Sequence, residues 1–311
     1  MAEISIEYIN ELAKSDPARL IREAEENYRA FADSIVKRVV ENENIRIILL
    51  AGPSGSGKTT TANILADGIR EAGLESRVIS LDDFYREHND PSYPKMPDGE
   101  RDYESPDALD LPEIEKTMLD IVRGGDFTVP KYDFKVGGRV DLRKYPKISH
   151  GCVIIEGLHA LNPKIFEHLP KDRILRVFIS VSTNVNEGGE RILSGRKLRF
   201  VRRMVRDSIY RGASAERTLD MWTGVLIGEE KYLYPFRENA DVDFNTFHAF
   251  EPCVMRPYVL KLISDELAES DGFARTVRSA MKLTHAIDEE LVPDASLIRE
   301  FIEGGKYEEF Y

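Results

Sequence analysis

Residues 52–59 read Gly-Pro-Ser-Gly-Ser-Gly-Lys-Thr, a stretch whose residue types can enclose a chain of phosphates. They fit the pattern G-x-x-x-x-G-K-[ST] without a mismatch. In such a loop the backbone N–H groups wrap the phosphate oxygens, and glycine permits both the close approach and turns with positive φ. We call residues 52–59 the glycine loop and expect it to bind a nucleotide together with Mg²⁺.

The surroundings of the glycine loop support this interpretation. An apolar run precedes it at 45–51, and a helical pattern follows it as far as Gly73. This order of strand, loop and helix favours a phosphate site over an ordinary Gly-Ser turn. We expect Lys58 to reach the β- and γ-phosphates, Thr59 to ligate Mg²⁺, and the positive end of the helix to face the anion. The residues expected to contact the nucleotide are Gly52, Ser54, Gly55, Ser56, Gly57, Lys58, Thr59 and Thr60.

Two carboxylates follow apolar runs that read as strands. Asp82 ends RVISLD at 77–82, and Glu156 lies in CVIIEG at 152–157. Ligands of open α/β sheets bind at the carboxyl ends of the strands, so both side chains would face the phosphates. We expect Asp82 to accept a proton from a hydroxyl nucleophile and Glu156 to organise magnesium or water, although the two roles could be shared. The alternative for Asp82 is a helix cap or turn residue, and Asp83 is expected to be a turn residue.

Seven arginines lie between residues 191 and 211 of an otherwise acidic chain. Arg199, Arg202, Arg203 and Arg206 recur at three-to-four spacing, which places them on one face of a helix. Such a face could form a lid, at about residues 188–215, that neutralises a transferred phosphoryl group and excludes water. The alternatives are a solvated helix face and a helix that pairs with acidic surface elsewhere.

Five short apolar runs alternate with amphipathic stretches and predict an α/β fold with a parallel sheet and helices on both faces. Segment 1–44 is expected to be a helical extension, with a restart at Asp16-Pro17, and 45–265 to be the main domain. Segment 86–110 is expected to be a long excursion from the sheet. Segment 266–311 is expected to be a helical tail, whose end, from Leu291, has no assignment. The runs are 45–51, 77–82, 152–157, 174–180 and 241–245.

Composition limits the classes of partner. The 311 residues carry a formal net charge of −12, which argues against a general nucleic-acid binder, since that needs a basic surface. No run of about 18 apolar residues exists, so no membrane span is expected. The two cysteines give no disulfide framework, and a cytoplasmic location is the expectation. The N-terminal helix stripe could cover the main domain or seal a homo-oligomer.

Several motifs together resemble the uridine kinase and phosphoribulokinase family of P-loop kinases over about residues 46–245. The resemblance implies a P-loop parallel sheet and an ATP-dependent kinase for a hydroxyl of a small polar molecule. In nucleoside members that hydroxyl is the 5′-hydroxyl of a ribonucleoside. The motifs are GPSGSGKTT, LDDFYR, SPDALD at 105–110, VPKYDF at 129–134, VIIEGLHAL at 153–161, RRMVRDSIYRG at 202–212 and ADV at 240–242.

The resemblance also assigns roles to single residues. Asp82 matches the catalytic aspartate of the family. Tyr85, Asp110 and Tyr132 would border the acceptor site. Arg203, Arg206 and Arg211 would be lid residues that close on the phosphates and the substrate, with Arg206 acting in catalysis.

The chain departs from uridine-cytidine kinases where those enzymes read the base. A histidine that usually follows Y-D-F is replaced by Gly137, and three further positions carry Leu109, Ala213 and Met221. The small-molecule acceptor therefore stays open between a nucleoside and another small alcohol or sugar phosphate. A nucleotide-binding protein without catalysis is the alternative from another class.

Overall fold

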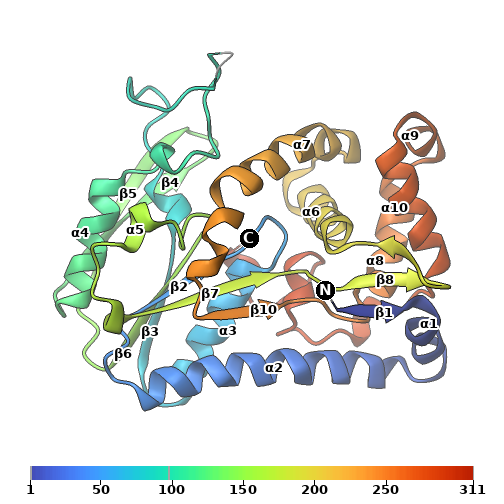
Figure 1. The fold of residues 1–311 in the computed structure, drawn as a ribbon, viewed down its shortest axis with the longest axis horizontal. Helices are drawn as coiled ribbons and strands as arrows, with labels where there is room; N and C mark the ends of the chain where they lie inside the picture. The colour runs from blue at the N-terminus through green and yellow to red at the C-terminus, as the bar shows by residue number, and fades with distance from the viewer. Residues whose placement is uncertain (1, 97–98, 311) are drawn as a thin grey trace.

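The computed structural model describes residues 2–96 and 99–310, and a five-stranded parallel sheet forms its centre (Figure 1). The strand order is β10–β7–β2–β6–β3. All five predicted runs are confirmed as strands, although β3 ends at Ser80, so that Asp82 falls in the following turn. The bounds are β2 Ile47–Ala51, β3 Glu75–Ser80, β6 Gly151–Glu156, β7 Ile174–Ser180 and β10 Val242–Asn245.

Helices cover both faces of the sheet, as the sequence predicts. Alternate residues of β2 enter different cores, because side chains of a strand point to opposite faces. Ile48 and Leu50 join the core formed with α2 (Pro17–Glu41) and α3 (Lys58–Glu71). Ile47, Leu49 and Ala51 join the core formed with α4 (Leu111–Val122) and α5 (Pro163–Phe166). The predicted α/β fold with a doubly covered parallel sheet is confirmed.

The N-terminal extension packs on the main domain. Asp16 caps α2 by accepting a hydrogen bond from the N–H of Arg19 at 2.9 Å, and Pro17 opens the helix as predicted. The expectation of an entirely helical start is wrong for β1 (Glu3–Ser5), which pairs with β8 (Asn184–Glu187) in a small separate sheet. The apolar stripe of α2 lies in the same core as α3. The stripe is therefore covered within the chain.

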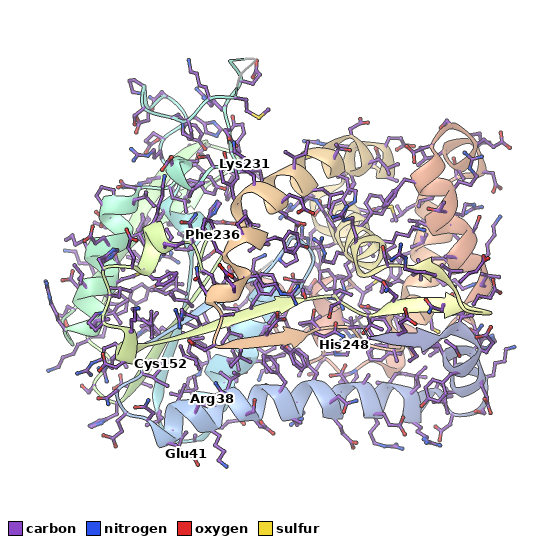
Figure 2. The ribbon with its side chains drawn as sticks, in the orientation of Figure 1. Arg38, Glu41, Cys152, Lys231, Phe236 and His248 are labelled. Carbon is purple, nitrogen blue, oxygen red and sulfur yellow. The ribbon has the colours of Figure 1, made fainter. Side chains whose placement is uncertain are left out.

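The remaining elements surround this framework. The described parts of the predicted excursion, residues 86–96 and 99–110, project from the body at the upper left of Figure 1. Among the described residues, no helix is both long and apolar enough to cross a membrane. Cys152, at the amino end of β6 (Figure 2), and Cys253 are buried free thiols. The other strands and α-helices are α1 Ile6–Ser15, β4 Phe127–Asp133, β5 Gly138–Tyr145, β9 Glu190–Leu193, α6 Gly195–Arg211, α7 Ala215–Tyr232, α8 Glu251–Leu262, α9 Asp265–Ser270 and α10 Gly272–Leu283.

The end of the chain, which the sequence left unassigned, packs beside α3 (Figure 1). Its described residues contain the short 3-10 helices η6 (Leu297–Glu300) and η7 (Glu308–Phe310). Lys306 and Tyr307 both bond to Asp67 of α3, at 2.6 and 2.7 Å. Four apolar side chains of this segment are fully buried in the main core, namely Leu297, Ile298, Phe301 and Ile302.

Candidate active site

The glycine loop connects β2 to α3, and its backbone requires glycine at two positions. Gly55 and Gly57 have φ values of 74° and 89°, in the left-handed region that other residues rarely adopt. A Cβ at Gly55 would lie 2.7 Å from the carbonyl oxygen of Arg199. Because α3 begins at Lys58, the N–H groups of its first turn have no intrahelical acceptor and can bind an anion. This geometry agrees with the predicted nucleotide contacts of Gly52 and residues 54–60, which stay a prediction.

The tip of the glycine loop is held by α6, which lies in the predicted lid, and by α7, which follows it. Glu229 of α7 accepts a hydrogen bond from the N–H of Ser54 at 2.9 Å. Arg199 of α6 donates to the carbonyl oxygen of Ser54 at 2.9 Å and binds Glu229 through two further bonds of 2.7 and 2.9 Å. Arg203 donates to the hydroxyl of Ser54 at 2.8 Å. Both helices, α6 and α7, therefore contact the glycine loop directly, and we call them the lid helices.

Two of the four arginines on the predicted cationic face are buried in ion pairs. Arg199 and Arg202 are each at most 2% exposed. Arg202 pairs with Glu251 of α8 and donates to the carbonyl oxygen of Thr246 at 2.7 Å. The solvated-face alternative is wrong for these two residues. Neither Glu229 nor Glu251 was expected from the sequence, because each lies about 30 to 50 residues from its arginine with no motif to mark it.

The other lid arginines gather around one aspartate. Arg203, Arg206 and Arg211 lie 3.4, 3.0 and 3.2 Å from the carboxylate of Asp207. Burial lowers the pKa of Arg203, and the charges of Arg206 and Arg211 lower it further. Arg211 itself is 58% exposed. The positive charge of Arg211 reaches Asp82 and opposes the burial that raises the pKa of that carboxyl. The structure thus brings one lid cation, Arg211, within electrostatic reach of the predicted base.

Asp82 and Glu156 meet at the carboxyl ends of two neighbouring strands. Ser80, the last residue of β3, lies opposite Glu156 in the register with β6. Burial raises the pKa of Glu156 to about 7, with the charge of Asp82 adding to the rise and that of Lys58 opposing it. The side chain of Asp82 is exposed, yet desolvation by the surrounding residues raises its pKa as well, against the charge of Lys58. Both carboxylates therefore lie within electrostatic reach of Lys58.

The raised pKa of Glu156 predicts a pH-dependent stability difference. The folded protein binds this proton more tightly than the unfolded chain, whose carboxyl has an ordinary pKa of 4.5. The free energy of unfolding should therefore fall as the pH rises from about 4.5 to about 7, by about 3 kcal/mol for this group. We expect Glu156→Gln to match the wild type at pH 5 and to exceed it at pH 8 in urea unfolding. Replacement of the exposed Glu71 by glutamine is the control, and an equal difference at both pH values would contradict the prediction.

The predicted acceptor residues lie in an aromatic cluster beside Asp82. The rings of Tyr85 and Tyr132 have centroids 5.7 Å apart, and Phe134 lies 5.4 and 5.0 Å from them. The hydroxyl of Tyr85 donates to the carbonyl oxygen of Tyr103 at 3.0 Å. Burial raises the pKa of Tyr85, and the charge of Asp82 raises it further. The cluster thus joins the site of the predicted base.

Asp110 and Asp83, which lie next to this cluster, form ion pairs with the β4–β5 hairpin. Asp110 caps α4 and accepts a bond from Arg139 of β5 at 2.8 Å, so it has a structural role in addition to its predicted contact with the acceptor. Asp83 lies in a 3-10 turn, in agreement with the expected turn, but its buried carboxylate also pairs with Arg143 and Lys131 of the β4–β5 hairpin. These pairs fix the hairpin against the turn that carries Asp82.

His88 and Glu104 join the acceptor region from the excursion, and the sequence did not single them out. A Cβ at Gly137 would lie 2.4 Å from Nδ1 of His88, so the glycine leaves room for that ring. Burial raises the pKa of Glu104. The positive charge of Arg203 lowers this pKa, and the negative charge of Asp82 raises it further. Lys231, near the end of α7 (Figure 2), lies 3.7 Å from Asp102 of the same excursion. The lid helices and the excursion therefore meet over the site.

The oxygen ligands present suit Mg²⁺. Thr59 is the second residue of α3, and the buried carboxylate of Glu156 is within electrostatic reach of Asp82. Hydroxyl and carboxylate oxygens are the donors that Mg²⁺ takes, and it commonly adds phosphate oxygens and water. In the part of the chain that the structure describes, no cluster of three or more His, Cys, Asp or Glu forms a metal site by itself. The protein would therefore hold the ion through few side chains.

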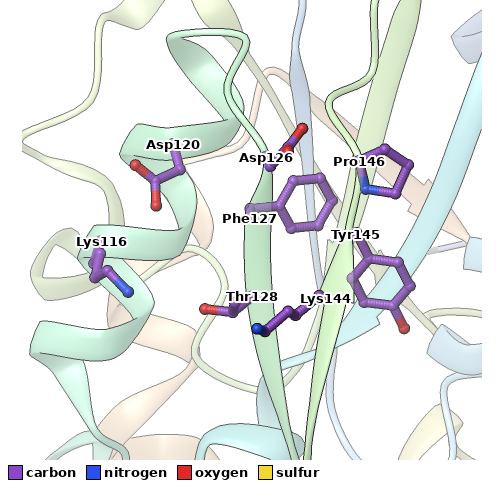
Figure 3. Close-up of a pocket in the computed structure, with 8 residues that line it drawn as sticks. All are labelled: Lys116, Asp120, Asp126, Phe127, Thr128, Lys144, Tyr145 and Pro146. Atoms are coloured by element: carbon purple, nitrogen blue, oxygen red, sulfur yellow. The ribbon is translucent and has the colours of Figure 1, made fainter.

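A separate pocket lies between α4 and the end of the β4–β5 hairpin that is opposite its turn (Figure 3). Phe127 and Tyr145 form its apolar wall, while Lys116 and Asp120 border it from α4. It opens at the end of β4 that lies away from Tyr132. This pocket shares no residue with the glycine loop or the aromatic cluster and is not part of the candidate site.

The sequence is similar to a known protein family and to several of its members. Residues 47–250 match the phosphoribulokinase / uridine kinase family. A uridine kinase of Schizosaccharomyces pombe is 28% identical over 195 residues, which cover 63% of this chain and 37% of that protein. A uridine kinase of Staphylococcus aureus is 26% identical over 197 residues, which cover 63% of this chain and 85% of that protein. The chain thus matches little more than a third of the first relative.

The solved structure of the YGR205w protein has a TM-score of 0.50 at 17% identity and covers 72% of this chain and 94% of that chain. A likeness at this identity supports the fold alone. The family match extends from the first central strand to the residues that follow the last one. It includes the glycine loop, both carboxylates and the arginines of α6. Since this match covers well over half of the sequence, the chain belongs to the phosphoribulokinase / uridine kinase family.

Proposed function

We propose that the protein transfers the γ-phosphoryl group of ATP to a hydroxyl of a small molecule, with a ribonucleoside 5′-hydroxyl as the first acceptor to test. The observation that carries the proposal is the convergence of Lys58, Asp82 and Glu156 at one end of the sheet, next to the glycine loop. A loop that only bound a nucleotide would not need two carboxylates opposite Lys58. The proposed kinase domain is 45–265, with the lid at about 188–215.

The residues divide the chemistry as follows. Backbone N–H groups of the glycine loop and Lys58 bind the phosphates. Asp82 accepts the proton of the acceptor hydroxyl while the oxygen of that hydroxyl attacks the γ-phosphorus. The bond between the γ-phosphorus and the bridging oxygen of the β-phosphate breaks, and ADP leaves. Arg203, Arg206 and Arg211 balance the charge that spreads over the transferred group. Thr59 and Glu156 would hold Mg²⁺, and the ion would supply positive charge to the phosphate oxygens.

The acceptor region favours an uncharged molecule over a sugar phosphate. The rings of Tyr85, Tyr132 and Phe134 offer stacking surfaces, while the nearby cations Arg139 and Arg143 are engaged by carboxylates. A phosphorylated acceptor would need cations that are not already neutralised. Asp110 could bind ribose hydroxyls, as carboxylates of such pockets do.

The test is ADP release from Mg-ATP with a panel of acceptors. The panel holds uridine, cytidine, purine nucleosides, deoxynucleosides, ribulose 5-phosphate and simple sugars. Turnover with one nucleoside supports the proposal, whereas turnover with a sugar phosphate alone assigns the other branch of the family. ATP binding without turnover on any acceptor would favour a protein that only senses the nucleotide.

A further inference from the structure

The C-terminal segment 293–303, which we call the tail segment, packs against one side of the glycine loop. A Cβ on Gly57 would lie 2.6 Å from Cδ1 of Leu297, so the two residues are in direct contact. The guanidinium of Arg202 lies 5.1 Å from the ring centre of Phe301. The hydroxyl of Tyr210 donates to the carbonyl oxygen of Ile302 at 3.2 Å. The backbone of the tail segment is therefore fixed to α3 and to the lid helix.

This packing places a carboxylate on the first turn of α3. Oε2 of Glu300 accepts hydrogen bonds from the backbone N–H of Thr60 at 3.2 Å and from its hydroxyl at 2.8 Å. Glu300 is 4% exposed. Thr60 is the third residue of α3, where an N–H has no acceptor within the helix and binds anions. Glu300 thus bonds to Thr60, one of the residues that the sequence predicts to contact the nucleotide.

The second oxygen of the same carboxylate faces the lid. Oε1 of Glu300 lies 3.8 Å from Nη1 of Arg206. A phosphate on the glycine loop would use this same pair of partners, a first-turn N–H on one side and a lid arginine on the other. The carboxylate therefore imitates an anionic ligand on both sides. The family match ends at residue 250, so the tail segment lies outside the matched domain.

We propose that Glu300 competes with the nucleotide for the phosphate position at Thr60 and thereby lowers the affinity of the glycine loop for ATP. The inference rests on the proposed function, because it assigns a regulation to that same site. Two anions cannot use one N–H, so a bound phosphate must displace the side chain of Glu300. The buried side chains of Leu297 and Phe301 keep the backbone in place, and a rotation of Glu300 toward Arg206 is sufficient. The apparent affinity for ATP equals the intrinsic affinity multiplied by the fraction of molecules in which Glu300 has left the position at Thr60.

The experiment measures the dissociation constant of Mg-ATP by calorimetry for the wild type and for Glu300→Gln and Glu300→Ala. The glutamine variant keeps the shape and removes the charge, while the alanine variant removes the competitor. We expect ATP to bind at least about tenfold more tightly to Glu300→Ala and to a smaller degree to Glu300→Gln. Glu303→Gln is the matched control, since this exposed glutamate of the same segment has no bond to Thr60. Its affinity should equal that of the wild type.

The outcomes separate the inference from the function on which it rests. Equal or weaker ATP binding by the glutamine variant, with the wild type binding normally, overturns the role of Glu300 alone. If the wild type and every variant bind no ATP, the nucleotide site and the inference fail together. Should the alanine variant not fold, the isosteric glutamine variant still decides the question. Turnover on the acceptor panel is measured separately and does not enter this comparison.

Discussion

Replacement of Asp82 by asparagine should lower kcat for phosphoryl transfer by at least about a hundredfold, the usual contribution of a positioned general base. Asparagine keeps the size of the side chain but cannot accept the proton of the acceptor hydroxyl. The KM for ATP should change little, since the nucleotide binds through the glycine loop and Lys58. Because the pKa of Asp82 is raised, the wild-type kcat should also fall as the pH drops and this carboxylate becomes protonated. Steady-state kinetics with the acceptor found on the panel give both values.

Asp107→Asn supplies the control for this experiment. Asp107 lies in the excursion that also borders the site, but it is exposed and its carboxylate pairs with the surface residue Lys164 at 2.7 Å. Its replacement should leave kcat within about twofold of the wild type, as expected for an exposed ion pair. If Asp82→Asn keeps more than a tenth of the wild-type kcat, another group takes the proton. Glu156, whose buried carboxyl has a pKa of about 7, would then be the next candidate.

The sheet and the core of the site could be predicted because their signals are local. Continuous apolar runs mark buried parallel strands, and a carboxylate just after such a run lies at the edge where ligands bind. Asp82 and Glu156 meet Lys58 because β3 and β6 are neighbours, and β6 in turn pairs with β2. The glycine loop needs no partner from elsewhere to be recognised, since its backbone conformation demands glycine at Gly55 and Gly57.

What the sequence did not reveal depends on contacts between distant segments. The spacing of the arginines in α6 predicts a common face, yet Arg199 and Arg202 are buried because Glu229 and Glu251 reach them from later helices. The tail segment has apolar residues without a regular period, because it contacts its neighbours through irregular backbone. The contact between Glu300 and Thr60 spans 240 residues. No pattern along the chain records such a pairing.

Replacement of Glu229 by alanine should lower the free energy of unfolding by about 3 to 5 kcal/mol, the usual cost of removing one partner of a buried ion pair. Glu229 is 0% exposed and Arg199 is 2% exposed, so the variant leaves the charge of Arg199 buried without its counterion. It also removes the acceptor for the N–H of Ser54. The loss should therefore weaken ATP binding as well, because the tip of the glycine loop depends on this carboxylate. Urea unfolding and ATP titration measure the two effects.

Glu230→Ala is a matched control one residue further along α7. Glu230 also pairs with an arginine, Arg196, at 2.9 Å, but its side chain is 61% exposed. An exposed pair contributes at most about 1 kcal/mol, since water and salt screen both charges. The two variants thus differ in burial and in the contact with Ser54, while the residue type and the helix stay the same. Equal losses of stability in both would mean that the buried pair does not hold the loop. A large loss confined to Glu229→Ala would show that the lid helices stabilise the glycine loop before any ligand binds.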